Sequence, residues 1–111
     1  MNVIEDDVKS AVEKELQAAT ERFGLHNSNH EKMAVIAEEF EECGEALASL
    51  RQKVHCAWSR TRDNCDSYMM ADAYERIYDS AVKLAIEACQ TAAMADKAIK
   101  RMEEESDETD T

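Results

Sequence analysis

The stretch Arg62-Asp63-Asn64-Cys65-Asp66 separates two long segments that are rich in helix-forming residues. Asp and Asn favour turns because their short side chains hydrogen-bond to nearby backbone groups. The chain has 111 residues, no proline and only two glycines, so it has few other breakers. This stretch therefore predicts the turn of a helical hairpin. The expected fold class is all-α, a helical bundle built on a long antiparallel hairpin plus an N-terminal helix.

Three helices are expected around this turn. Apolar residues at steps of three and four predict a first helix over about 3–23, and Gly24 is placed to end it. The stretch Ser28-Asn29-His30-Glu31 has the Ser-x-x-Glu capping pattern, which predicts that a second helix begins there and ends near Ser59. Asp66 is the predicted cap of the third helix.

Apolar stripes predict which faces of the two long helices pack. On the second helix the stripe comprises Met33, Ile36, Phe40, Leu47, Val54 and Trp58. On the third helix it comprises Tyr74, Ile77, Ala81, Ala85, Ala88, Ala92, Ala95 and Ile99. Because alanine is small, the second of these faces suits either close helix packing or a pocket.

One domain is expected over residues 1–102, because a chain of this length with 44% hydrophobic residues has no room for a second core. Residues 103–111 are acidic and lack apolar side chains. Such a segment repels itself and has little to bury, which predicts a disordered tail.

Composition also limits the partners. The formal net charge of −12 disfavours binding to nucleic acid or to an anionic membrane through a basic face. No apolar run approaches the roughly 20 residues that span a bilayer, and the N-terminus lacks the pattern of a signal peptide, so we expect a cytoplasmic protein. The four cysteines have no Cys-x-x-Cys spacing, so neither disulfides nor a zinc site is expected.

Two polar motifs would face each other in the predicted hairpin. Residues that face each other across an antiparallel hairpin have position numbers with a constant sum. Glu39 with Gln90, and Glu42 with Glu87, share one sum, which places the centre of the turn between residues 64 and 65. Residues three apart lie on one helix face, so each helix would contribute two oxygen-bearing side chains to one site.

Oxygen ligands of this kind are typical of Mg²⁺, which binds a few carboxylates together with substrate phosphates. The predicted metal ligands are Glu39, Glu42, Glu87 and Gln90. Glu38 and Glu41 are the spare carboxylates that could assist the attacking water, and Glu38 is the predicted catalytic residue. Lys83 lies one helical turn before Glu87 and is the predicted substrate-binding residue. Lys97, Lys100 and Arg101 are interpreted as surface charges that balance an acidic protein. The alternative for the glutamates is an ordinary solvated helix face.

The stretches 23–31, 34–42 and 87–95 resemble the short MazG-like proteins of the all-α nucleoside triphosphate pyrophosphohydrolase superfamily, including versions carried by phages. The hallmark of that family is Glu-Glu-x-x-Glu on one helix and Glu-x-x-Asp on the next. The first motif is present as Glu38, Glu39 and Glu42, whereas Gln90 stands where the family has Asp. The gap between the motifs is also longer than in the family.

The resemblance implies an enzyme that uses Mg²⁺, with Mn²⁺ as a possible substitute, to cleave nucleoside triphosphates to monophosphate and pyrophosphate. It also implies a homo-oligomer. Because Gln90 brings no negative charge and cannot act as a base, a non-catalytic nucleotide-binding or sequestering protein is one alternative. A structural helical module that oligomerises is another.

Overall fold

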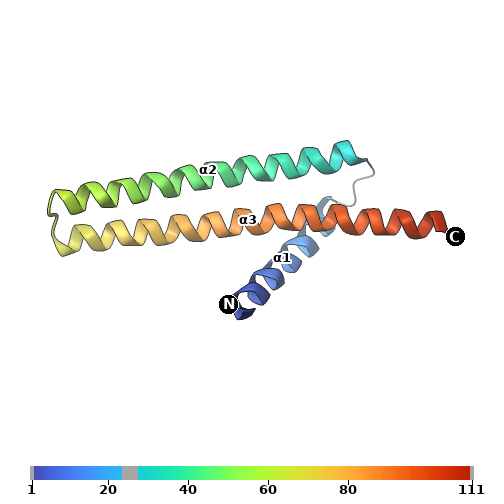
Figure 1. Cartoon of the computed structure of the whole chain (residues 1–111), viewed down its shortest axis with the longest axis horizontal. Helices are drawn as coiled ribbons and strands as arrows, with labels where there is room; N and C mark the ends of the chain where they lie inside the picture. Colours follow the sequence, from blue (N-terminus) through green and yellow to red (C-terminus); the bar gives the residue numbers. More distant parts are fainter. Residues whose placement is uncertain (1, 24–27, 111) are drawn as a thin grey trace. The chain divides into compact units, whose positions relative to one another are not determined.

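The computed structural model describes residues 2–23 and 28–110, and these form three helices (Figure 1). Helix α1 spans Asn2–Phe23, α2 spans Asn29–Arg62 and α3 spans Ser67–Asp110. No strand occurs among the described residues. The predicted all-α fold is therefore confirmed. The predicted helix end at Gly24 lies outside the described residues.

The predicted capping residues are both confirmed. The Ser28 hydroxyl accepts a hydrogen bond from the Glu31 backbone N–H at 3.1 Å, which satisfies one of the free amides at the start of α2. At the start of α3, the Asp66 carboxylate accepts a hydrogen bond from the Met69 backbone N–H at 2.9 Å. Helix α2 continues for three residues past Ser59.

The turn between α2 and α3 is at the predicted place. Asn64 has a φ of 55°, a left-handed conformation that asparagine adopts more readily than most residues. Across the turn, the Arg60 guanidinium donates hydrogen bonds to the Met69 carbonyl at 2.8 Å and to the Asp72 carboxylate at 2.9 Å. The last turn of α2 is thereby attached to the first turns of α3.

The chain divides into two compact units. The first comprises residues up to Phe40 and from Ala88 onward, and the second comprises residues from Glu41 to Glu87. In the second unit α2 and α3 run antiparallel on either side of the turn (Figure 1). The prediction of a single domain over residues 1–102 stays a prediction.

The two units have different cores. In the first unit Leu16 of α1 packs with Ala93 and Met94 of α3, and further apolar side chains of α1 and α2 pack against them, namely Val12, Val35 and Ile36. In the second unit the buried apolar residues are the small side chains Ala46, Ala57 and Ala73. The buried apolar residues of the second unit are therefore smaller than Leu16 and Met94 of the first unit, and its larger residues Leu50, Ile77 and Leu84 are half-buried.

Both long helices bury a face that is offset by about one residue from the predicted stripe. On α2 the buried and half-buried positions include Lys32, Ile36, Glu39, Cys43, Ala46, Leu50, Lys53, Ala57 and Arg60. On α3 they include Ala73, Ile77, Ser80, Leu84, Glu87, Thr91, Met94, Ala98, Arg101 and Glu105. These positions alternate steps of three and four, the spacing of helices that pack along a seam.

The predicted stripes were therefore wrong in phase. Met33, Phe40, Leu47 and Trp58 of α2 are exposed, as are Tyr74 and most of the predicted alanines of α3. The reason is that the packed faces carry several polar side chains, so hydrophobicity alone favoured the neighbouring faces. A consequence is that Glu39 and Glu87 lie on the packed faces.

Helix α3 continues through Asp110, into the segment for which the sequence predicts a disordered tail. The disorder of that tail stays a prediction. Glutamate has a high helix propensity, and ion pairs hold the beginning of this segment. Arg101 pairs with Glu104 at 3.3 Å and with Glu105 at 3.4 Å, and Lys32 of α2 lies 3.7 Å from Glu105. These cations offset the self-repulsion of the acidic residues.

A membrane span would need a long, strongly apolar helix. None of the helices in the described part of the chain meets that requirement.

Candidate functional site

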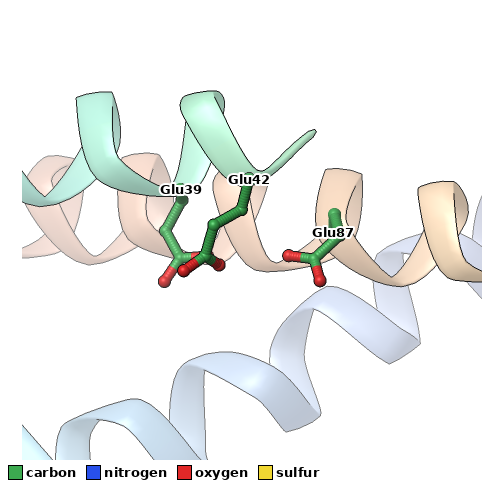
Figure 2. Close-up of side chains that lie close together, drawn as sticks. All are labelled: Glu39, Glu42 and Glu87. Atoms are coloured by element: carbon green, nitrogen blue, oxygen red, sulfur yellow. The ribbon is translucent and has the colours of Figure 1, made fainter. Parts of the chain in front are cut away.

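Three of the four predicted metal ligands come together (Figure 2). One carboxylate oxygen from each of Glu39, Glu42 and Glu87 lies within 4.8 Å of the other two. Glu39 and Glu42 project from successive turns of α2, and Glu87 projects from α3 (Figure 2). We call these three residues the acidic group.

Glu87 is the most buried member of the acidic group, with 5% of its surface exposed. It lies on the packed face of α3, and one of its oxygens forms an ion pair with the Lys83 ammonium at 2.8 Å. The hydrogen bond to Glu87 raises the pKa of Lys83, and the charges of Glu87 and Glu42 add to this effect. Lys83 therefore stays protonated beside the acidic group.

The two members on α2 differ in exposure. Glu39 is half-buried because it lies on the packed face, whereas Glu42, three residues later, is exposed. The group therefore combines carboxylates held in place by packing with one that solvent reaches freely. An arrangement of this kind gives a cation fixed ligands and an open route of entry.

The remaining predicted site residues are a glutamine, a lysine and a glutamate that is not one of these three carboxylates. Gln90 is half-buried and follows Glu87 by one helical turn on α3. Glu38 is exposed and precedes Glu39 by one residue, a step of about 100° around the helix. The side chain of Lys83 is 65% exposed and its ammonium contacts Glu87. The roles predicted for these three residues stay predictions.

The acidic group concentrates negative charge in a small volume. Carboxylates this close repel one another, and the repulsion is relieved by a cation or by protonation. The Lys83 ammonium lies beside these carboxylates and pairs with Glu87. Since the donors are all carboxylate oxygens, a hard divalent ion fits the group better than a soft metal that prefers sulfur or imidazole.

The interpretation of Lys97 as a surface charge was wrong. Only 3% of its surface is exposed, and its ammonium has no hydrogen-bond partner among the described residues. Lys97 follows Ala93 and Met94, both core residues, by four and three positions on α3. This spacing is the signal in the sequence from which the burial of Lys97 could have been predicted. Lys100, in contrast, is exposed and pairs with Asp96 at 3.3 Å, as a surface charge does.

Comparison of the chain with protein-family models, with curated proteins and with solved structures found no match. The resemblance to MazG-like proteins therefore stays a prediction, based on the motif residues alone.

Proposed function

We propose that this chain is a divalent-cation-dependent pyrophosphohydrolase, which cleaves nucleoside triphosphates to monophosphate and pyrophosphate. The observation that carries the proposal is the convergence of Glu39, Glu42 and Glu87 from two helices. Two of these carboxylates lie on packed faces, which is unusual for an ordinary solvated run of glutamates. The motif resemblance supplies the class of reaction.

The donor set suits Mg²⁺, with Mn²⁺ as a substitute. Glu39, Glu42 and Glu87 would hold the ion through carboxylate oxygens, and Gln90 would add a neutral amide oxygen. When bound, the ion supplies positive charge that stabilises the phosphates as charge develops during attack. Three carboxylates leave room in the ion's preferred set of six ligands for water and substrate oxygens.

In this proposal, Lys83 is the partner of Glu87 that a bound metal ion displaces. In the absence of a ligand its ammonium neutralises part of the charge on Glu87. A divalent ion on Glu87 would compete with this contact, and the released ammonium would then be available to a substrate phosphate. Lys83→Met should therefore strengthen metal binding and weaken triphosphate binding.

Glu38 is proposed to orient the attacking water. It is exposed and does not belong to the acidic group, so its contribution can be tested separately from metal binding. Glu38→Gln should lower turnover while the increase in Tm caused by Mg²⁺ stays unchanged.

A homo-oligomer is part of the same proposal. Helix α2 exposes Met33, Phe40, Leu47 and Val54, which are seven residues apart, and Phe40 is 68% exposed. A row of exposed apolar side chains at this spacing is suited to packing against another helix. A second copy of the chain is the proposed partner. Leu47→Glu should lower the molar mass measured by light scattering to that of a single chain.

The function is tested by incubating the protein with ribo- and deoxynucleoside triphosphates and either Mg²⁺ or Mn²⁺, and measuring pyrophosphate release. Glu42→Gln and Glu87→Gln should each lower the release on the order of a hundredfold, because each removes a charged ligand while keeping the side chain's size. Glu75→Gln is the matched control, since Glu75 is an exposed glutamate of α3 in the same unit as Glu87.

Metal-dependent release that the control retains and both site variants lose would support the enzyme. Nucleotide-induced stabilisation without release would instead favour the non-catalytic binding protein. If neither Mg²⁺ nor any nucleotide changes the Tm, the structural module is the better description.

A further inference from the structure

Three basic side chains gather in the first unit, and none of them belongs to the acidic group. Lys32 comes from α2, and Lys97 and Arg101 come from α3. They line one small cavity, together with the apolar side chains Val35, Met94 and Ala98. We call Lys32, Lys97 and Arg101 the basic group.

All three members of the basic group are largely withdrawn from solvent. Lys32 is 6% exposed and Lys97 is 3% exposed. The Arg101 side chain is 19% exposed. Lysine and arginine are rarely buried unless they are paired, and a group of three in a strongly acidic protein needs an explanation.

The members differ in their partners. Lys32 lies 3.7 Å from the Glu105 carboxylate, and Arg101 pairs with Glu105 at 3.4 Å and with Glu104 at 3.3 Å. The Lys97 ammonium, however, has no hydrogen-bond partner among the described residues. Burial also lowers the pKa of Lys97, because removal from water disfavours the charged form. An anion beside the ammonium would supply the missing hydrogen-bond partner and would raise the pKa of Lys97.

We propose that the basic group binds a phosphate group, with Lys97 as the buried donor and Lys32 and Arg101 at the mouth of the site. The cavity has a volume of about 10 Å³, which is enough for one oxygen atom but not for a whole anion. One phosphate oxygen enters the cavity and accepts a hydrogen bond from Lys97. The other oxygens stay at the surface, where the forked guanidinium of Arg101 and the Lys32 ammonium hold them.

Glu105 competes with the phosphate in this arrangement. Its carboxylate already lies close to both cations at the mouth, so an incoming phosphate shares or displaces those contacts. The ligand class is therefore a phosphate dianion, either free or as a monoester, because it offers more charge and more acceptor oxygens than the carboxylate does.

The test measures the Tm of the full chain in sodium phosphate, in glycerol phosphate and in sodium chloride of equal ionic strength. Phosphate should raise the Tm more than chloride does. Lys97→Met should weaken phosphate binding by about tenfold to a hundredfold, the range for losing a hydrogen bond to a charged group. Lys100→Met is the matched control, because Lys100 is an exposed lysine of the same helix paired with Asp96, and it should bind phosphate as the parent does.

A response to glycerol phosphate as well as free phosphate identifies a monoester site, and a response to free phosphate alone identifies an inorganic phosphate site. Equal Tm values in phosphate and chloride, or equal phosphate binding by Lys97→Met and the parent, would overturn the proposal. Glu105→Gln provides a second test that leaves Lys97 in place. It should bind phosphate more tightly than the parent, and unchanged or weaker binding would contradict the proposed competition.

Discussion

The acidic group and the basic group concentrate charge of opposite sign, and they differ in how that charge is compensated. Glu87 of the acidic group has Lys83 within 2.8 Å, and that lysine is largely exposed. Lys97 of the basic group is buried and lacks a hydrogen-bond partner among the described residues. An exposed counter-ion can exchange for a ligand at little cost, whereas a buried charge destabilises the fold until a ligand arrives. The acidic group should therefore respond to its ligand mainly in activity, and the basic group mainly in stability.

The largest expected effect is the loss of stability caused by truncating Leu16, a core residue next to the basic group. Leu16 packs with Met94, which lines the cavity of Lys97. Leu16→Ala should lower the free energy of unfolding by about 2–3 kcal/mol, near the low end for a buried leucine because the neighbouring core is small. Urea unfolding measures this change. Val8→Ala, at an exposed position of α1, should have little effect; an equal loss in both variants would contradict the assignment of Leu16 to the core.

Glu87→Gln tests the contribution of the acidic group to activity. The variant keeps the size of the side chain but removes a charged metal ligand and the ion pair with Lys83. Turnover should fall on the order of a hundredfold, because loss of a ligand weakens both metal binding and transition-state stabilisation. Initial rates of pyrophosphate release at saturating Mg²⁺ measure the effect. Unchanged rates would remove Glu87 from the proposed site.

Gln90→Asp should raise turnover, whereas Glu87→Gln should lower it. A fourth carboxylate beside the acidic group adds negative charge, which should tighten Mg²⁺ binding by roughly tenfold since ligand charge sets the affinity of such sites. Calorimetric titration with Mg²⁺ checks the affinity, and turnover should rise with it. If Gln90→Asp binds Mg²⁺ no better than the parent, Gln90 does not contribute to a metal site.

The smallest effect is expected for a surface charge that is already well compensated. Hydrogen bonds from Arg60 and then Arg76 lower the pKa of Asp72. A lowered carboxyl pKa stabilises the fold above the usual carboxyl range, and this contribution is lost as the pH falls through the folded-state pKa. Asp72→Asn should therefore lower the Tm slightly at pH 7 and match the parent in strong acid. Melting curves across this pH range would show whether the difference disappears.

The ends of the helices could be predicted from the sequence, because capping and turn chemistry depend on neighbours in the chain. Ser28 and Asp66 cap the helices as expected, and Asn64 adopts the left-handed turn. The facing of Glu42 and Glu87 followed from the position of that turn. Local rules were sufficient for these features.

The packed faces were harder to predict, because hydrophobicity favoured the wrong phase of each long helix. Phe40 and Trp58 are large and apolar, yet both are exposed, whereas Lys32 and Lys97 are buried. Burial of these lysines depends on which residues of α1, α2 and α3 come together in the first unit. A single sequence gives no direct signal of those contacts beyond the spacing of Lys97 from Met94.

The alanine core of the second unit has a consequence for the response to temperature. Ala46, Ala57 and Ala73 expose little apolar surface when the helices separate, and the larger residues of the same packed faces, Leu50, Ile77 and Leu84, are already half-exposed in the folded chain. The heat-capacity change on unfolding scales with the apolar surface that becomes exposed, and it determines the curvature of stability with temperature. The hairpin end of the molecule therefore has a small heat-capacity change for its length, and its stability varies gradually between cold and warm conditions.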